Sequence, residues 1–103
     1  MIYGLKQTVV NKIQQVLSDH SDVQKAILYG SRAMGNYKPG SDIDLTLEGA
    51  ALTLRQLNTI ENELDDLLLP YEFDLSICHQ IGNPDLLKHI QRVGVVFYTR
   101  AKS

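Results

Sequence analysis

Three aspartates lie in two short segments in which apolar and polar residues alternate. Asp42 and Asp44 lie in "DIDLTLE" (42–48), and Asp74 lies in "YEFDLSIC" (71–78). This alternation predicts strands, so Asp42 and Asp44 should leave the same face, with their Cα atoms roughly 6.6–6.8 Å apart. Aspartate is disfavoured inside strands, and its presence at these positions therefore indicates a functional use.

If the two strands are neighbours, the three carboxylates converge on one polar face of a sheet. Like charges this close raise one another's pKa unless a cation compensates them. All-oxygen ligands suit Mg²⁺ or Mn²⁺, and two such ions about 3.5–4 Å apart promote displacement at phosphorus. The sequence therefore predicts that Asp42, Asp44 and Asp74 bind metal. The competing interpretation is that they are solvated acids on half-exposed strands.

A glycine-serine turn, "LYGSRAMG" (28–35), precedes the aspartates. We expect a strand to run into Gly30-Ser31 and then into a short helical turn, where backbone N–H groups favour anions and glycine permits the close approach of a phosphate. Ser31 adds a hydroxyl donor, and Arg32 and Lys38 are cations that could face a polyphosphate. Many such turns merely terminate a strand, and this one is neither a Walker A loop nor a dinucleotide-binding fingerprint.

The rest of the chain predicts the elements that position these residues. A capping box of Thr53 and Gln56 begins a long helix with an apolar stripe that includes Leu54 and Leu68, and Pro70 ends this helix. The remaining predicted elements are a helix over 4–18, a strand over 23–30, a helix that Asn83 and Pro84 begin and Gly94 ends, and a short strand over 95–98.

The two alternating segments, 42–48 and 71–78, each have one apolar and one polar face. They therefore predict an α/β (α+β) fold, a two-layer sandwich in which helices cover a mixed β-sheet on one face and leave the other open to solvent or a ligand. The length of 103 residues indicates one domain, 1–103.

Composition excludes several classes of function. The formal net charge of −2 argues against extended nucleic-acid binding. The single cysteine, Cys78, permits no internal disulfide, and the N-terminus does not resemble a signal peptide. No apolar run is long enough to span a membrane, so we expect a cytoplasmic protein. His20, His79 and His89 lack metal-ligand spacing and are expected to have surface or capping roles.

Gly30-Ser31, ten further residues and Asp42-Ile43-Asp44 form the pattern G-S-x10-D-x-D. This pattern resembles the signature of the DNA polymerase β-type nucleotidyltransferase superfamily, in which a third carboxylate, here matched by Asp74, lies on a later strand. The short chain looks like the minimal nucleotidyltransferases (MNT). Proteins of that group are usually paired with a separately encoded helical partner, which is either a substrate-binding subunit or a HEPN-type toxin.

The resemblance implies a role for each matching residue. Gly30 and Ser31 would hold the β- and γ-phosphates of a nucleoside triphosphate, Asp42 and Asp44 would bind two Mg²⁺ ions, and Asp74 would bind the catalytic ion and help deprotonate the attacking hydroxyl. Met34 stands where many members of the family have a basic residue. Its presence removes one possible phosphate contact, for which Lys38 could substitute.

The function implied is Mg²⁺-dependent transfer of a nucleoside monophosphate, AMP from ATP or the equivalent from another nucleoside triphosphate, to a hydroxyl acceptor. Pairing with a HEPN-type toxin implies a hetero-oligomer in which this chain is the antitoxin and modifies a tyrosine of the toxin. The alternative is a largely non-catalytic subunit that neutralises or scaffolds its helical partner. A third reading is a nucleotide or metal sensor.

Overall fold

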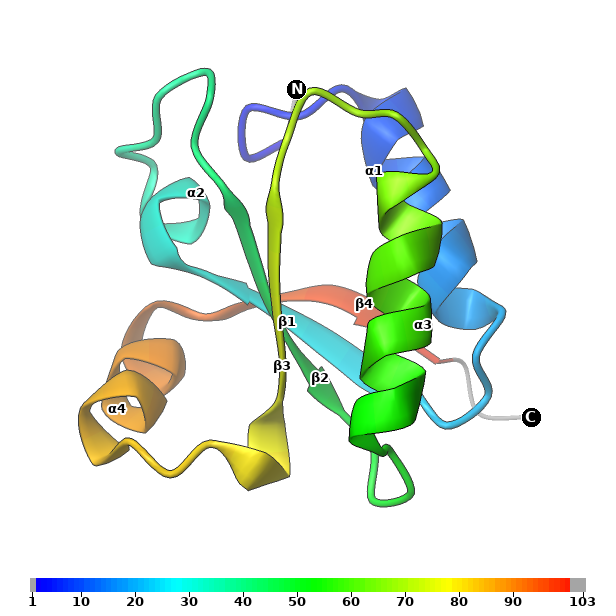
Figure 1. Cartoon of the computed structure of the whole chain (residues 1–103). Helices are drawn as coiled ribbons and strands as arrows, with labels where there is room; N and C mark the ends of the chain where they lie inside the picture. Colours follow the sequence, from blue (N-terminus) through cyan, green and yellow to red (C-terminus); the bar gives the residue numbers. More distant parts are fainter. Residues whose placement is uncertain (1, 101–103) are drawn as a thin grey trace.

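The structure is a computed structural model of the chain, and it describes residues 2–100. Helices and strands alternate along the chain, with one short 3-10 turn (Figure 1). The elements are α1 (Gln7–Ser18), β1 (Lys25–Tyr29), α2 (Gly30–Met34), β2 (Ile43–Glu48), α3 (Leu54–Asp65), β3 (Phe73–Ile77), η1 (Cys78–Gln80), α4 (Pro84–Val93) and β4 (Val95–Thr99).

The strands form one mixed sheet with the order β3-β2-β1-β4. β1 runs antiparallel to both β2 and β4, whereas β2 and β3 are parallel. A parallel pair needs a crossover connection, and α3 provides it. The predicted mixed sheet and α+β class are confirmed.

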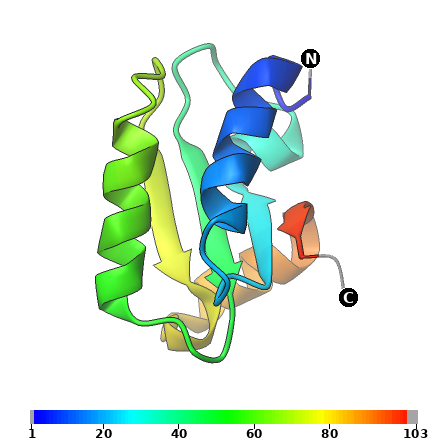
Figure 2. The same cartoon turned by 90° about the vertical axis from the view of Figure 1, so that its right-hand side faces the viewer.

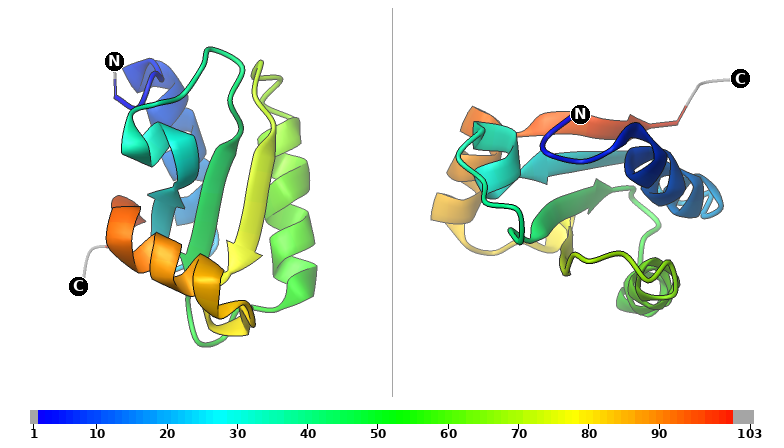
Figure 3. Two further views of the ribbon diagram at one scale, coloured as in Figure 1. Left: turned by 90° about the vertical axis from the view of Figure 1, so that its left-hand side faces the viewer. Right: turned by 90° about the horizontal axis from the view of Figure 1, so that it is seen from above.

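Helices α1 and α3 lie side by side on one face of the sheet (Figures 2 and 3). Their buried side chains meet the inward residues of the strands and form the main hydrophobic core. From the helices this core takes Val10, Ile13, Val16, Leu17, Leu57, Ile60 and Leu64, and from the strands Ala26, Leu28, Ile43, Leu45, Leu47, Leu75, Ile77 and Phe97.

The second face is not free of helices, which differs from the expected one-sided cover. α2 and α4 lie on it and contact each other (Figure 3). The physical reason is the centre of this face, where Ile27 and the fully buried Thr46 are direct neighbours on β1 and β2. α4 contacts β1, and its Ile90 is buried. Gly94 permits the close approach, since an added Cβ would lie 2.7 Å from Cγ2 of Ile27. Asp42 and Asp74 remain exposed at the starts of β2 and β3.

Two helix boundaries differ from the sequence-based expectation. α1 begins at Gln7, because Tyr3 and Gly4 adopt left-handed conformations (φ 56° and 74°) in a turn. α3 ends at Asp65, and Leu68, also left-handed, is 88% exposed and lies outside the predicted stripe, while Leu54 is 61% exposed. No helix within residues 2–100 is long and apolar enough to cross a membrane.

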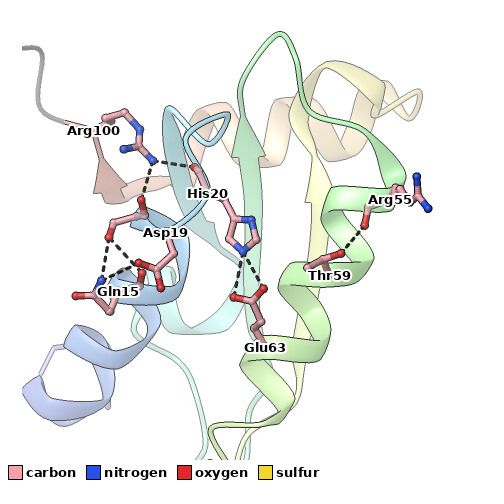
Figure 4. Close-up of polar contacts among 8 residues, drawn as sticks. Gln15, Asp19, His20, Arg55, Thr59, Glu63 and Arg100 are labelled. Carbon is pink, nitrogen blue, oxygen red and sulfur yellow. Dashed lines mark hydrogen bonds and ion pairs between the residues drawn. The ribbon is translucent and has the colours of Figure 1, made fainter.

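Polar contacts link the turn after α1 to α3 and to the end of β4 (Figure 4). Nε2 of His20, after α1, lies 3.0 Å from the carboxylate of Glu63 on α3. The guanidinium of Arg100, after β4, donates to the carbonyl oxygens of Ser18, His20 and Val23. These contacts fix the turn between α1 and β1 against the rest of the fold.

Candidate active site

Register brings two of the predicted carboxylates side by side. Asp44 on β2 is the direct neighbour of Asp74 on β3, and on its other side Asp44 faces Tyr29 on β1. Direct neighbours in a sheet point to the same face, so Tyr29, Asp44 and Asp74 form a row across three strands. Asp42 precedes β2 by one residue and is exposed near the same end of the sheet.

Gly30 links the glycine-serine turn to this row. It begins α2 with a φ of 74°, a left-handed conformation that favours glycine. An added Cβ would overlap Oδ2 of Asp44, so the carboxylate lies directly against the glycine backbone. The two halves of the sequence pattern therefore meet in space.

The electrostatics of the row are those of crowded acids. The pKa of Asp44 is raised from its ordinary value of 3.8 to about 6, first by burial and then by the charges of Asp74 and Asp42, while His89 acts in the opposite direction. Burial also raises the pKa of Tyr29, and Asp74 and Asp44 add to this effect. Acids arranged in this way are stabilised by a cation placed among them.

The residues fit a hard divalent cation in chemical type. Three carboxylates supply the oxygen ligands that Mg²⁺ prefers, and the glycine at position 30 leaves the space that Asp44 occupies. Within residues 2–100, however, no three acidic, histidine or cysteine side chains are gathered closely enough to enclose an ion. Binding therefore requires the exposed side chains of Asp42 and Asp74 to turn toward Asp44.

Arg32 does not lie where a nucleotide contact would place it. Its side chain is only 2% exposed, and its guanidinium donates to the main-chain oxygens of Tyr3, Pro39 and Ser41. The predicted phosphate contact is corrected on this evidence, because the donors that would meet a phosphate are already used inside the fold.

The other predicted nucleotide ligands lie on α2 and the loop after it. Ser31 is half-buried next to Gly30, and Lys38 is exposed in the loop, where its backbone N–H donates to Oγ of Ser41. Met34, at the end of α2, is 50% exposed. Their contact with a nucleotide stays a prediction.

Sequence reasoning missed two residues beside the aspartates. The ring of His89, on α4, meets the ring of Tyr29 edge to face, with centroids 6.2 Å apart. The sequence could have indicated the place of Tyr29 beside the site, because Tyr29 precedes Gly30 at the end of a predicted strand. His89 was not, since its position depends on the packing of α4 across the second face.

Comparison with known proteins identifies the family. The sequence profile described as "Polymerase beta, Nucleotidyltransferase" matches residues 11–103. The chain belongs to this nucleotidyltransferase family. The match confirms the resemblance read from the G-S-x10-D-x-D pattern. No curated protein sequence matches the nucleotidyltransferase chain significantly.

Solved structures share the nucleotidyltransferase fold. A chain from the crystal structure of a toxin-antitoxin with AMP-PNP superposes with a TM-score of 0.73 at 24% identity, covering 88% of this chain and 73% of that one. A chain from the complex of tri-AMPylated Shewanella oneidensis HEPN toxin with MNT antitoxin gives 0.70 at 21% identity, with coverages of 93% and 74%. The toxin-antitoxin MntA-HepT gives 0.68 at 22%, with coverages of 92% and 74%. At these identities the likeness shows the fold alone.

Proposed function

We propose that this nucleotidyltransferase uses Mg²⁺ to transfer a nucleoside monophosphate, AMP from ATP, to a hydroxyl acceptor with release of pyrophosphate. The observation that carries the proposal is the row in which Asp44 is the direct neighbour of Asp74 and touches Gly30. It brings the turn that is predicted to bind phosphate together with paired carboxylates, which is what phosphoryl-type transfer needs from a protein.

Each residue has a definite task in this proposal. Asp42, Asp44 and Asp74 hold the cations, which when bound would supply Lewis-acid stabilisation of the phosphates and the attacking oxygen. Gly30 and Ser31 hold the β- and γ-phosphates through their N–H groups and the serine hydroxyl. Asp74, exposed at the edge strand β3, is open to an incoming acceptor and receives the proton of its hydroxyl.

We further propose that the acceptor is presented by a separately encoded helical protein of the HEPN type, and that this chain acts as its antitoxin. Support comes from solved structures that share the fold and are toxin-antitoxin complexes, one with AMP-PNP and one with a tri-AMPylated toxin. In this proposal the acceptor group is a tyrosine hydroxyl of the partner.

The test is label transfer from ATP, labelled at the α-phosphate, to the protein encoded beside this chain in the presence of Mg²⁺. We expect labelled partner with the wild-type chain, and none with Asp42→Asn combined with Asp44→Asn or after EDTA treatment. Asp65→Asn combined with Asp66→Asn removes the same charge from exposed positions at the end of α3 and should leave transfer intact.

A result without transfer separates the alternatives. If the Asp42→Asn and Asp44→Asn chain still neutralises its partner, the chain is a binding antitoxin and catalysis is not its function. If ATP binds but no label reaches any partner protein and no pyrophosphate is released, the hypothesis of a nucleotide sensor replaces that of an enzyme.

A further inference from the structure

Arg32 is a buried cation that lacks an anionic partner. Its side chain is 2% exposed, and within residues 2–100 no carboxylate lies within salt-bridge distance of it. Its charge is met by main-chain oxygens and by two aromatic rings, those of Tyr37 and Tyr71, with ring centroids 5.4 and 4.8 Å from Cζ. A buried charge held in this way is costly unless its geometry serves a purpose.

The hydrogen bonds of Arg32 converge on the chain just before Asp42. Nε and Nη2 both donate to the carbonyl oxygen of Ser41, at 3.1 and 2.8 Å, and Nη2 also reaches that of Pro39 at 3.3 Å. Ser41 is the residue directly before Asp42. The planar guanidinium therefore fixes the main chain from which Asp42 projects.

The side chain of Arg32 also contacts two further segments, the N-terminal turn and the residues just before β3. Nη1 donates to the carbonyl oxygen of Tyr3 at 3.0 Å. Tyr71, whose ring contacts the guanidinium, lies two residues before β3. The next residue, Glu72, accepts a hydrogen bond at its carbonyl oxygen from the N–H of Ile43 at 2.9 Å. Arg32 thus lies between residues 39–42, the arm that carries Asp42, and the start of β3, the strand that carries Asp74.

We propose that Arg32 is a positioning residue of the metal site, which sets the place of Asp42 relative to Asp44 and Asp74 through the carbonyl oxygen of Ser41. This inference rests on the proposed function, because it takes the three aspartates as the metal ligands. Groups that orient metal ligands from behind change metal affinity by about 10–100-fold when they are removed.

Three variants test the role. Arg32→Met keeps most of the volume and removes every donor, whereas Arg32→Lys keeps the charge and one point of donation but loses the paired contact with Ser41. Arg55→Met is the matched control, since Arg55 is an exposed arginine on α3 that points away from its neighbours (Figure 4). Circular dichroism and thermal melting establish that each variant is folded.

The first readout is the affinity for Mn²⁺, measured by electron paramagnetic resonance without substrate. We expect Arg32→Met to weaken Mn²⁺ binding by about tenfold or more, Arg32→Lys to restore part of the loss, and Arg55→Met to have no effect. The second readout is amide hydrogen exchange of loop 35–42, which should accelerate by about tenfold in Arg32→Met alone, because the carbonyl oxygens of Pro39 and Ser41 lose their donor.

Unchanged Mn²⁺ affinity and loop exchange in folded Arg32→Met would overturn the inference. Loss of metal-free ATP binding with unchanged Mn²⁺ affinity would also overturn it, in favour of a phosphate contact. If Arg32→Met does not fold, the comparison of Arg32→Lys with Arg55→Met decides in the same way. If the wild-type chain binds no Mn²⁺, the proposed function fails on that result, and loop exchange still decides whether Arg32 fixes the arm.

Discussion

Asp44 bears the electrostatic cost of the site. It is half-buried between Tyr29 and Asp74 and rests on Gly30, and its ionised form gains no described hydrogen bond or ion pair in return. Because its folded-state pKa of about 6 lies above the ordinary 3.8, its contribution to stability is fully present below about 3.8 and is lost as the pH rises through 6.

Asp44→Asn should therefore stabilise the metal-free protein at about pH 8. The gain is about 1 kcal/mol after allowance for solvent screening, which raises Tm by about 4–8 °C in a domain of this size. At about pH 5 the gain should be smaller, since the wild-type carboxyl is then largely protonated. Thermal melts of the two proteins at both pH values provide the measurement.

Added Mg²⁺ should reverse the order at pH 8, because it stabilises a chain that binds it and Asp44→Asn removes one of the proposed ligands. Asp65→Asn, an exposed acid on α3, is the control and should follow the wild type with and without Mg²⁺. An Asp44→Asn variant less stable than the wild type at pH 8 without metal would contradict the assigned cost.

A site residue could be predicted from the sequence where its placement in the fold has a local cause. The expected shared face of Asp42 and Asp44 follows from the two-residue period of a strand, which is a local cause. Arg32 was misread because its burial depends on Tyr3 and Tyr71, which are far from it in sequence. A cation near a phosphate-binding turn looks the same in sequence whether it faces outward or inward.

The elements divide the molecule into a layer for stability and a layer for the site. α1 and α3 bury the main core on one face, while α2 and α4 frame the aspartate row on the other. The start of α3 was predictable because a capping box is a local signal, and its Thr53 and Gln56 contacts are both present. The end of α3 was not, since leucines continue past it and only packing decides which are buried.

Thr53→Ala tests this division at the level of an element. The substitution removes the hydroxyl that accepts from the N–H of Gln56, and helix caps of this type contribute about 1 kcal/mol. We expect a fall in Tm of about 4–8 °C. Mn²⁺ affinity should not change, because the start of α3 lies on the face opposite the aspartates.

Thr59→Ala is the matched control on the same helix. Its hydroxyl only donates to the carbonyl oxygen of Arg55 within α3 (Figure 4), so its loss should change stability little. Equal effects of the two substitutions on Tm, or an effect of Thr53→Ala on Mn²⁺ binding, would argue against the division into two layers.

At the scale of the whole molecule, two arginines hold opposite regions by the same device. Arg32 gathers main-chain oxygens from the N-terminal turn and the loop before β2. Arg100 gathers those of Ser18, His20 and Val23, and so fastens the end of the edge strand β4 to the turn after α1. Only the first of these arginines is connected to a carboxylate of the site.

Arg100→Met should therefore lower the stability of the fold without weakening Mn²⁺ binding. Three carbonyl oxygens lose their donor, which lowers the free energy of unfolding by about 1–3 kcal/mol. The measurement is urea denaturation, paired with Mn²⁺ binding by the folded protein. Arg32→Met should lower both quantities, whereas Arg100→Met should lower only the first. Equal weakening of Mn²⁺ binding by the two would mean that general loosening of the fold, and not the arm that carries Asp42, governs the metal site.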